Sequence, residues 1–277
     1  MIKFIVIDLD DTLIGYDLGV SKRNVVAIRK AMRSGIDVTL ATGRTFQTAE
    51  PFMKTLGINL PLICYNGALV RNGRRVYIEK MLPEQFYGEL IDFAKRNRVQ
   101  LAFYVSHHTM IYFNRPLDAF AKEYLDKIEQ VAEITLVNFK TFKLPRTPIK
   151  CMMISSEKKI AELFVKAKKK WDNRMYITIT RPTLLEFLHP EVNKGNALAY
   201  IAKHVIGAPL RQTMVIGDGM NDIPMLRKVR YSVAVKNAPA QVERVARYVV
   251  SSWEKDGVAE AVAWAIEHNK KIKSKKL

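Results

Sequence analysis

The segment Asp8-Leu9-Asp10-Asp11-Thr12 places three carboxylates directly after a run of apolar residues. If a strand continues through this segment, Asp8 and Asp10 point to the same side, because side chains alternate along a strand. Two such carboxylates repel each other unless they share a cation, or unless one holds a proton as a general acid. A short acidic turn after a strand would show the same residues. This segment alone indicates either a cation and acid/base site or a simple turn.

Three further groups of polar residues supply complementary chemistry. Thr42-Gly43-Arg44 combines a hydroxyl, a permissive backbone and the start of a predicted helix, which is typical of an anion-binding corner. Lys194 stands at the start of another predicted helix and could add an ammonium group. The segment Gly217-Asp218-Gly219-Met220-Asn221-Asp222 follows an apolar run and offers two more carboxylates and an amide. Each group alone could be an ordinary turn or a solvated residue.

The elements that must position these groups predict one common site. The apolar run over 4–7 is typical of a strand buried on both faces of a parallel sheet. It is followed by a helix that Ser21 caps, a strand over 37–41, a helix over 45–56 and a strand over 60–65. This order predicts right-handed parallel crossovers and a doubly wound α/β sheet. Because ligands of such sheets bind at the carboxyl ends of the strands, the polar groups would converge there.

The pattern changes between residues 83 and 188, where helices alternate with paired strands, as in an α+β module. The pattern of a parallel α/β sheet resumes at Pro190. We therefore expect a discontinuous core of residues 1–82 and 189–277 and an inserted domain of residues 83–188. The elements expected in the inserted block are helices over 84–96, 117–128 and 157–171 and strands over 101–105, 110–113, 151–155, 175–180 and 184–188. In the remainder they are a helix over 196–206 and strands over 213–216, 232–235 and 248–250.

Charge is the unusual feature of the composition. The 277 residues include 45 Lys and Arg against 27 Asp and Glu, a net charge of +18. This excess favours a nucleic acid, an anionic membrane surface or an anionic small substrate as partner. The inserted block carries 18 basic and 12 acidic residues. Like-charged terminal blocks are usually solvated, so we expect a disordered C-terminal tail that holds Lys270, Lys271, Lys273, Lys275 and Lys276.

The apolar stretches are short and interrupted. The uncharged stretch over 55–70 contains two Asn and one Pro, and it is shorter than the roughly 18 apolar residues of a membrane span. Asp8 and Asp10 interrupt the apolar start of the chain, so a signal peptide is not expected. The only two cysteines, Cys64 and Cys151, lie far apart in apolar runs. These features favour a cytoplasmic protein without a membrane partner.

In order along the chain, Asp8-x-Asp10-x-Thr12, Thr42-Gly43-Arg44, Lys194 and the Gly217 to Asp222 segment resemble the four motifs of the haloacid-dehalogenase-like (HAD) hydrolases. Within that superfamily the chain is similar to the Cof-type phosphatases (type IIB), which insert a large α/β cap between their second and third motifs. The resemblance covers nearly the whole chain apart from the Lys-rich C-terminus. It implies a Rossmann-like doubly wound core with an inserted α+β cap that selects the substrate.

The resemblance also implies a role for each motif residue. Asp8 would be the nucleophile that forms an aspartyl-phosphate, and Asp10 would be the acid/base. Asp8, the backbone carbonyl of Asp10 and Asp218 would hold Mg²⁺, with Asp222 in support. The phosphoryl oxygens would be held by the Leu9 backbone amide, Thr42, Gly43, Lys194 and Asn221. Members of the family often carry Gly where this chain has Asp11, which we expect to face solvent.

Contacts to the leaving group are less defined. Arg44 and Asn66 are candidates, and Asn66 follows a predicted strand at the expected edge of the sheet. Arg146 and Arg181 are weaker candidates, because arginines in so basic a chain are usually solvated. His107-His108 is expected in an exposed hairpin turn, with closure over a substrate as the alternative.

The sequence thus predicts a Mg²⁺-dependent phosphatase of small phosphorylated metabolites, such as sugar phosphates or phosphorylated cofactors. A phosphomutase with the same chemistry is the nearest alternative. A nucleic-acid-binding protein is a distant one, because only the net charge supports it and no zinc finger, aromatic RNA-binding signature or basic recognition helix is present. The sequence leaves the particular substrate open, as well as the choice between monomer and homodimer.

Overall fold

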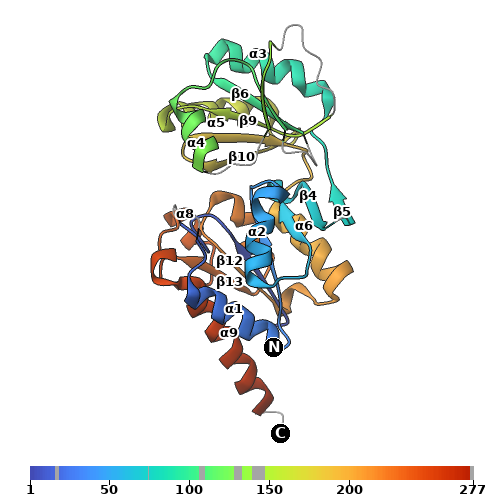
Figure 1. Cartoon of the computed structure of the whole chain (residues 1–277), viewed down its shortest axis with the longest axis vertical. Helices are drawn as coiled ribbons and strands as arrows, with labels where there is room; N and C mark the ends of the chain where they lie inside the picture. The colour runs from blue at the N-terminus through green and yellow to red at the C-terminus, as the bar shows by residue number, and fades with distance from the viewer. Residues whose placement is uncertain (16–18, 74, 106–109, 128–132, 139–146, 275–277) are drawn as a thin grey trace.

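A computed structural model of the chain describes residues 1–15, 19–73, 75–105, 110–127, 133–138 and 147–274. These residues form two lobes, each built around its own β-sheet (Figure 1). The sequence predictions for His107, His108, Arg146, Lys275 and Lys276 lie outside the described residues.

The lower lobe contains an eight-stranded sheet in the order β14-β13-β12-β1-β2-β3-β4-β5 (Figure 1). The first six strands are parallel: β14 (Tyr248–Val250), β13 (Tyr231–Val235), β12 (Thr213–Gly217), β1 (Phe4–Asp8), β2 (Asp37–Ala41) and β3 (Leu62–Cys64). The last two are antiparallel: β4 (Leu69–Asn72) and β5 (Arg75–Glu79). The sequence did not predict β4 and β5. Both strands are only partly buried, so they lack a continuous apolar run.

Helices cover both faces of this sheet, as the alternation along β1 requires. Ile5 and Ile7 pack in one apolar cluster with α1 (Lys22–Arg33), α2 (Phe46–Leu56) and α9 (Gly257–Ser274). Phe4 and Val6 pack in another cluster with α6 (Lys194–Ile201), α7 (Ile223–Leu226) and α8 (Ala240–Glu243). Successive side chains of a strand face opposite sides, so β1 is buried on both faces. The predicted doubly wound α/β core is confirmed.

Local capping sets where the helices that carry functional residues begin. The Ser21 side chain accepts a hydrogen bond from the Asn24 amide at 3.0 Å and starts α1. The Asn193 side chain does the same for the Asn196 amide at 2.8 Å. The helix expected from residue 196 therefore begins at Lys194. It ends as an α-helix at Ile201 and continues as one π-helical turn, Ala202–Ile206.

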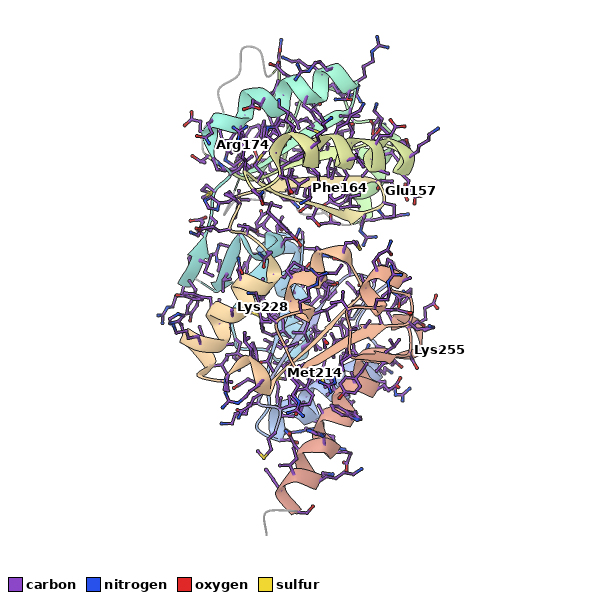
Figure 2. All side chains as sticks on the ribbon, turned by 180° about the vertical axis from the view of Figure 1, so that it is seen from behind. Glu157, Phe164, Arg174, Met214, Lys228 and Lys255 are labelled. Carbon is purple, nitrogen blue, oxygen red and sulfur yellow. The ribbon has the colours of Figure 1, made fainter. Side chains whose placement is uncertain are left out.

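The upper lobe contains a six-stranded sheet in the order β10-β11-β9-β6-β7-β8 (Figure 1). One of its faces packs against α3 (Tyr87–Asn97) and α5 (Glu157–Trp171), and Figure 2 shows Phe164 of α5 in this lobe and Met214 of β12 in the other. The other elements are β6 (Gln100–Val105), β7 (Met110–Phe113), α4 (Ala119–Lys127), β8 (Glu133–Leu136), β9 (Pro148–Ile154), β10 (Tyr176–Arg181) and β11 (Leu184–Leu188). The fold is an α/β core with an inserted α+β cap, as predicted.

The opposite face of the cap sheet packs against the core. Tyr104 of β6 and Met152 of β9 share an apolar cluster with Tyr65, which follows β3. Their chain neighbours Phe103 and Cys151 face α3 and α5 instead. The alternation along β6 and β9 therefore gives the cap sheet one face toward α3 and α5 and the opposite face toward the core and α4.

The prediction of a disordered C-terminal tail is wrong for Lys270, Lys271 and Lys273, which lie in α9. This helix extends below the lower lobe in Figure 1. Its earlier turns are buried in the apolar cluster with α1, and the Asn269 side chain exchanges two hydrogen bonds of 2.7 Å with the Ile2 backbone. Lysines also suit the last turn of a helix, where the helix dipole is negative. Packing of the preceding turns thus stabilises a segment whose charge alone indicated disorder.

Cys64 and Cys151 are both buried free thiols. Across the described residues, no helix combines the length and the apolar character needed to cross a bilayer.

Candidate active site

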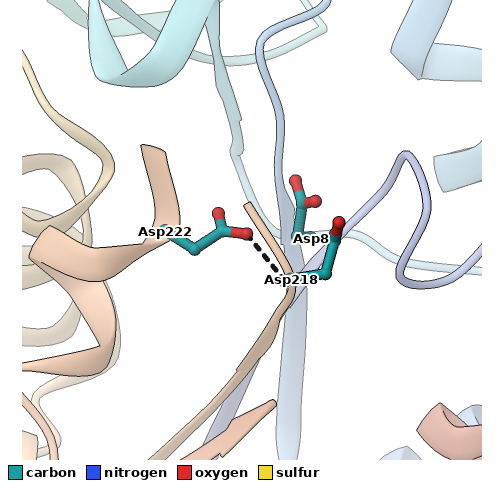
Figure 3. A group of neighbouring side chains, drawn as sticks. All are labelled: Asp8, Asp218 and Asp222. Carbon is teal, nitrogen blue, oxygen red and sulfur yellow. Dashed lines mark hydrogen bonds between the residues drawn. The ribbon is translucent and has the colours of Figure 1, made fainter. Parts of the chain in front are cut away.

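The carboxyl ends of two neighbouring parallel strands bring together the acidic residues of the first and last motifs. Asp8 ends β1, and Asp218 follows β12, which pairs with β1. Asp222 lies in the turn that follows β12. One carboxylate oxygen from each of these three residues lies within 4.8 Å of the others, and Figure 3 shows Asp8 and Asp218 side by side. Residues 210 positions apart in sequence therefore form one acidic cluster, as the strand order requires.

Lys194 joins two members of this cluster. Its Nζ donates to Asp8 Oδ1 and to Asp222 Oδ1, each at 2.6 Å, and all three side chains are buried. Burial alone would lower the pKa of Lys194, but the two carboxylates outweigh it and hold that pKa above its ordinary value. Burial and the Asp222 carboxylate raise the pKa of Asp8 well above its ordinary value, despite the opposing ammonium. Lys194 is thus a fixed cation, and its charge only partly offsets the cluster.

Asp218 is oriented by bonds from both sides of the cluster. The Thr12 hydroxyl donates to its Oδ1 at 2.5 Å, and its own backbone amide donates to Asp222 Oδ2 at 3.0 Å, the contact drawn in Figure 3. The Gly219 amide donates to the same Asp222 oxygen at 2.9 Å. Burial, followed by the Asp222 charge, raises the pKa of Asp218 to about 7. An added Cβ at Gly217 would lie 2.6 Å from Asp222 Oδ2, so this turn requires glycine.

The acidic cluster fits a divalent cation. The donor atoms are all carboxylate oxygens, the hard ligands that Mg²⁺ prefers. Burial is the larger cause of the raised pKa of Asp8 and Asp218, and the charge of Asp222, which the fixed ammonium does not fully offset, adds to it. A bound cation would supply the missing positive charge and reverse these shifts.

Asp10 lies apart from this acidic cluster and is held by two arginines. Arg44 donates from Nε to Asp10 Oδ2 at 2.9 Å and from Nη2 to Oδ1 at 2.6 Å. Arg181, at the end of β10 in the cap, donates from Nη2 to the same Oδ1 at 3.2 Å. Burial would raise the pKa of Asp10, but the arginines outweigh it and lower that pKa. The carboxylate of Asp10 is therefore a contact between core and cap.

Asp11 takes part in the same contact. Its φ of 59° is the left-handed conformation that favours glycine and that Asp tolerates better than most residues. Its Oδ2 lies 3.5 Å from Arg181 Nη1, and 31% of its side chain is exposed. The expectation that Asp11 faces solvent therefore needs correction, because this side chain is partly exposed and ion-paired with the cap.

Some of the phosphate-binding candidates line a cavity between core and cap, and others lie buried behind its wall. That cavity has a volume of about 60 Å³. The core residues that line it are Asp8, Asp10, Asp11, Gly43, Arg44, Asp218, Gly219 and Asn221, and the cap residues are Tyr124, Thr180, Arg181, Leu184 and Glu186. Thr42 and Lys194 are fully buried behind this surface, and the Thr42 hydroxyl accepts a hydrogen bond from the Arg44 amide at 3.1 Å.

Asn66 connects the phosphate-binding candidate Asn221 to a buried ion pair in the cap, which the sequence did not predict. Asn221 Nδ2 donates to Asn66 Oδ1 at 2.9 Å, and Asn66 Nδ2 donates to Glu186 Oε2 at 2.8 Å. Glu186 Oε1 in turn accepts from Lys150 Nζ at 2.8 Å, and Lys150 reaches the Gly43 carbonyl at 3.3 Å. The signal in the sequence was one charged residue inside each of two apolar strands, at Lys150 and Glu186.

The fold and the site together define a class of hydrolytic enzymes. A doubly wound core with carboxylates at its strand ends and an inserted cap above them is the arrangement of the haloacid dehalogenase-like hydrolases, whose family model matches residues 5–262. The chain belongs to this family. The prediction of an enzyme of this class, a phosphoric monoester hydrolase with a type IIB cap, is confirmed.

Individual relatives place the chain among phosphatases of this superfamily. It is 28% identical to a putative phosphatase of Streptococcus pyogenes serotype M6, over 94% of this chain and 97% of the relative. It is 27% identical to a 5-amino-6-(5-phospho-D-ribitylamino)uracil phosphatase of Bacillus subtilis, over 94% of each chain. In fold it is similar to a HAD subclass IIB sugar phosphatase, with a TM-score of 0.81 at 24% identity, covering 95% of this chain and 99% of the other.

Proposed function

We propose that this protein is a Mg²⁺-dependent phosphatase that hydrolyses small phosphorylated metabolites through an aspartyl-phosphate on Asp8. The observation that carries this proposal is that Asp8, Asp218 and Lys194 meet at one edge of the core sheet, and that Asp8, Asp10 and Asp218 line a cavity that the cap covers. Some of the relatives are named as phosphatases of small phosphorylated compounds, and these names support the substrate class.

In the first step, an Asp8 carboxylate oxygen attacks phosphorus while the bond from phosphorus to the leaving oxygen breaks. Asp10 enters this step as the protonated acid and donates its proton to that leaving oxygen, so an alcohol departs and Asp10 is left as a carboxylate. In the second step, Asp10 takes a proton from water, the resulting oxygen attacks phosphorus, and the bond to Asp8 breaks. Inorganic phosphate is released and both carboxylates return to their starting states. The 5% exposure of Asp8 limits access of bulk water to the nucleophile.

The other motif residues would hold the charged groups in place. Asp8, the Asp10 backbone carbonyl and Asp218 would bind Mg²⁺, and Asp222 would support them through the bonds described above. When bound, the cation neutralises charge that develops on the phosphoryl oxygens. The phosphoryl oxygens would be held by the Leu9 amide, Thr42, Gly43, Lys194 and Asn221.

The division of labour follows the chain. We assign catalysis to residues 1–82 and 189–277 and substrate selection to the cap, residues 83–188. Arg44 lines the cavity and would contact the leaving group. Asn66 was the other candidate, but its amide is engaged by Asn221 and Glu186, so we assign it to the orientation of Asn221. Two buried free thiols also support a cytoplasmic location.

Release of inorganic phosphate from a panel of phosphorylated metabolites, with Mg²⁺ and with a chelator, tests this proposal. We expect turnover of at least one member that requires Mg²⁺ and that Asp8→Asn abolishes. Asp92→Asn, a change of the same kind at an exposed position of α3, should leave turnover intact. No release from any member would contradict the proposal. Transfer of the phosphoryl group to a second hydroxyl would indicate a phosphomutase instead.

A further inference from the structure

Two arginines converge on the catalytic side of the cavity from different lobes. Arg44 comes from the start of α2 in the core and is 4% exposed, and Arg181 comes from the end of β10 in the cap. Both line the cavity that contains Asp8 and Asp10. The guanidinium groups therefore stand beside the position where a leaving group must lie once Asp8 faces the phosphorus atom.

In the described structure these guanidinium groups occupy both oxygens of Asp10. Oδ1 accepts from Arg44 Nη2 at 2.6 Å and from Arg181 Nη2 at 3.2 Å, while Oδ2 accepts from Arg44 Nε at 2.9 Å. An acid/base must present one carboxylate oxygen to the oxygen of the leaving group. Asp10 is freer to do this when it gives up at least one of these bonds. A group that replaces Asp10 at the arginines would favour the catalytic arrangement.

A second polar group at the same place is incompletely bonded. The Thr180 hydroxyl oxygen is buried and has no hydrogen-bond partner among the described residues. Thr180 precedes Arg181 and lines the same cavity. Buried hydroxyl groups are nearly always hydrogen-bonded, so an orphaned one in the wall of this cavity indicates a place for a polar ligand.

Beyond Arg181 there is room for the rest of a leaving group. A second cavity of about 200 Å³ is lined by Phe120, Tyr124, Lys127 and Arg181, among others. Tyr124 and Arg181 line both cavities. A leaving group that extends past Arg181 would thus meet two aromatic side chains of α4 in the cap, Phe120 and Tyr124, and the ion pair of Lys127 with Glu123.

We infer that Arg44 and Arg181 form a second anion site, and that the physiological substrate carries a carboxylate or a second phosphate on its leaving group. This inference rests on the proposed function and names the class of substrate. The anion would accept hydrogen bonds from Arg181, Arg44 and the Thr180 hydroxyl, and it would replace Asp10 at the arginines. Guanidinium groups bind carboxylate and phosphate through the same paired N–H donors, so the two anions share one recognition chemistry.

Matched substrates test this inference. Each pair differs by a single anion: 3-phosphoglycerate against glycerol 3-phosphate for a carboxylate, and fructose 1,6-bisphosphate against fructose 1-phosphate for a second phosphate. We expect the wild-type kcat/KM to be about ten- to a hundredfold higher for the doubly anionic member of at least one pair, the range of one charge-assisted hydrogen bond. The pair that shows the preference identifies the anion.

Variants separate recognition from structure. Arg181→Gln should reduce that ratio of kcat/KM values by about ten- to a hundredfold, and Arg181→Lys, which keeps the charge, should reduce it less. Arg174→Gln removes a charge from an exposed position of the cap and should leave the ratio unchanged. Phenyl phosphate, whose leaving group has no second charge, reports the underlying phosphatase activity.

Two results would overturn the inference while the phosphatase proposal stands. One is phenyl phosphate hydrolysis together with equal kcat/KM values in both wild-type pairs. The other is a loss in Arg181→Gln that is equal for both members of a pair, because Arg181 would then only position Asp10. If Arg181→Gln does not fold, Arg181→Lys and the wild-type ratio still decide. Absence of hydrolysis of every substrate, phenyl phosphate included, would instead contradict the proposed function.

Discussion

Replacing Lys150 by Met would test the buried ion pair at the contact between cap and core. The ammonium group is 0% exposed and its partner Glu186 is 2% exposed. Lys150 Nζ also lies over the Tyr104 ring at 4.3 Å and reaches the Gly43 carbonyl at 3.3 Å. Lys150→Met keeps most of the side-chain volume but removes every one of these electrostatic contacts.

The expected magnitude follows from the charge that remains. In Lys150→Met the Glu186 carboxylate stays buried and keeps the hydrogen bond from Asn66 Nδ2, and an uncompensated buried charge costs about 3–5 kcal/mol of folding free energy. Glu186→Gln alone should cost a similar amount because it leaves the ammonium buried. The double variant removes both charges, and replacing a complete buried pair by neutral residues is often close to neutral, so we expect a loss below about 2 kcal/mol.

Urea unfolding followed by tryptophan fluorescence measures these differences. Trp171 is fully buried in the cap, whereas Trp264 lies in α9 of the core, so the emission reports on both lobes. Lys168→Met, which removes an exposed pair with Asp172, is the matched control and should cost less than about 1 kcal/mol.

Either of two outcomes would refute this reasoning about the pair. The first is a cost below about 1 kcal/mol for Lys150→Met, which would show that the remaining Glu186 charge is solvated or protonated at little cost. The second is a double variant whose loss equals the sum of the two single losses, because two residues that interact directly must show a coupling free energy.

Three further predictions concern the acidic cluster and its supports. Folding raises the pKa of Asp218 from 3.8 to about 7, so its contribution to the stability of the metal-free protein is full below pH 3.8 and is lost as the pH rises to about 7. Mg²⁺ must displace that proton when it binds. Calorimetry should therefore show a Mg²⁺ affinity that rises between about pH 5.5 and 7.5 and a release of protons on binding. A Mg²⁺ affinity that does not change with pH would contradict this prediction. Thr12→Val removes the 2.5 Å bond to Asp218 and should weaken Mg²⁺ binding about tenfold in a titration of activity, whereas an unchanged affinity would exclude this supporting role. Gly195→Ala would place a Cβ 2.3 Å from the Pro224 carbonyl oxygen and should lower the free energy of unfolding in urea by about 1–3 kcal/mol. Gly88→Ala, which has open space around the added Cβ, is the control. Equal stability of the two variants would argue against the close approach at Gly195.

Much of the core could be predicted because its signals are local. Strand β2 and helix α5 have the predicted bounds, since an apolar run or an amphipathic spacing with a capping residue determines each of them. Strand β8 was not predicted, because its residues are mostly exposed and a strand without a buried face leaves no apolar pattern in the sequence. The last turns of α9 were misjudged because their order depends on contacts of Asn269 with Ile2, 267 positions away.

The candidate site divides in the same way. The sequence alone predicted that the four motifs converge at the carboxyl ends of the strands, and their resemblance to the haloacid-dehalogenase-like hydrolases implied the roles of their residues. The structure brings the ends of β1, β2 and β12 to one edge. Only the tertiary structure decided that Arg181 contacts Asp10 and that Lys150 pairs with Glu186. It also decided that Asn66 links this pair to Asn221. The physical reason is that an arginine, lysine or glutamate is solvated at a surface and paired in an interior. The packing of the cap on the core decides which of the two environments each side chain occupies.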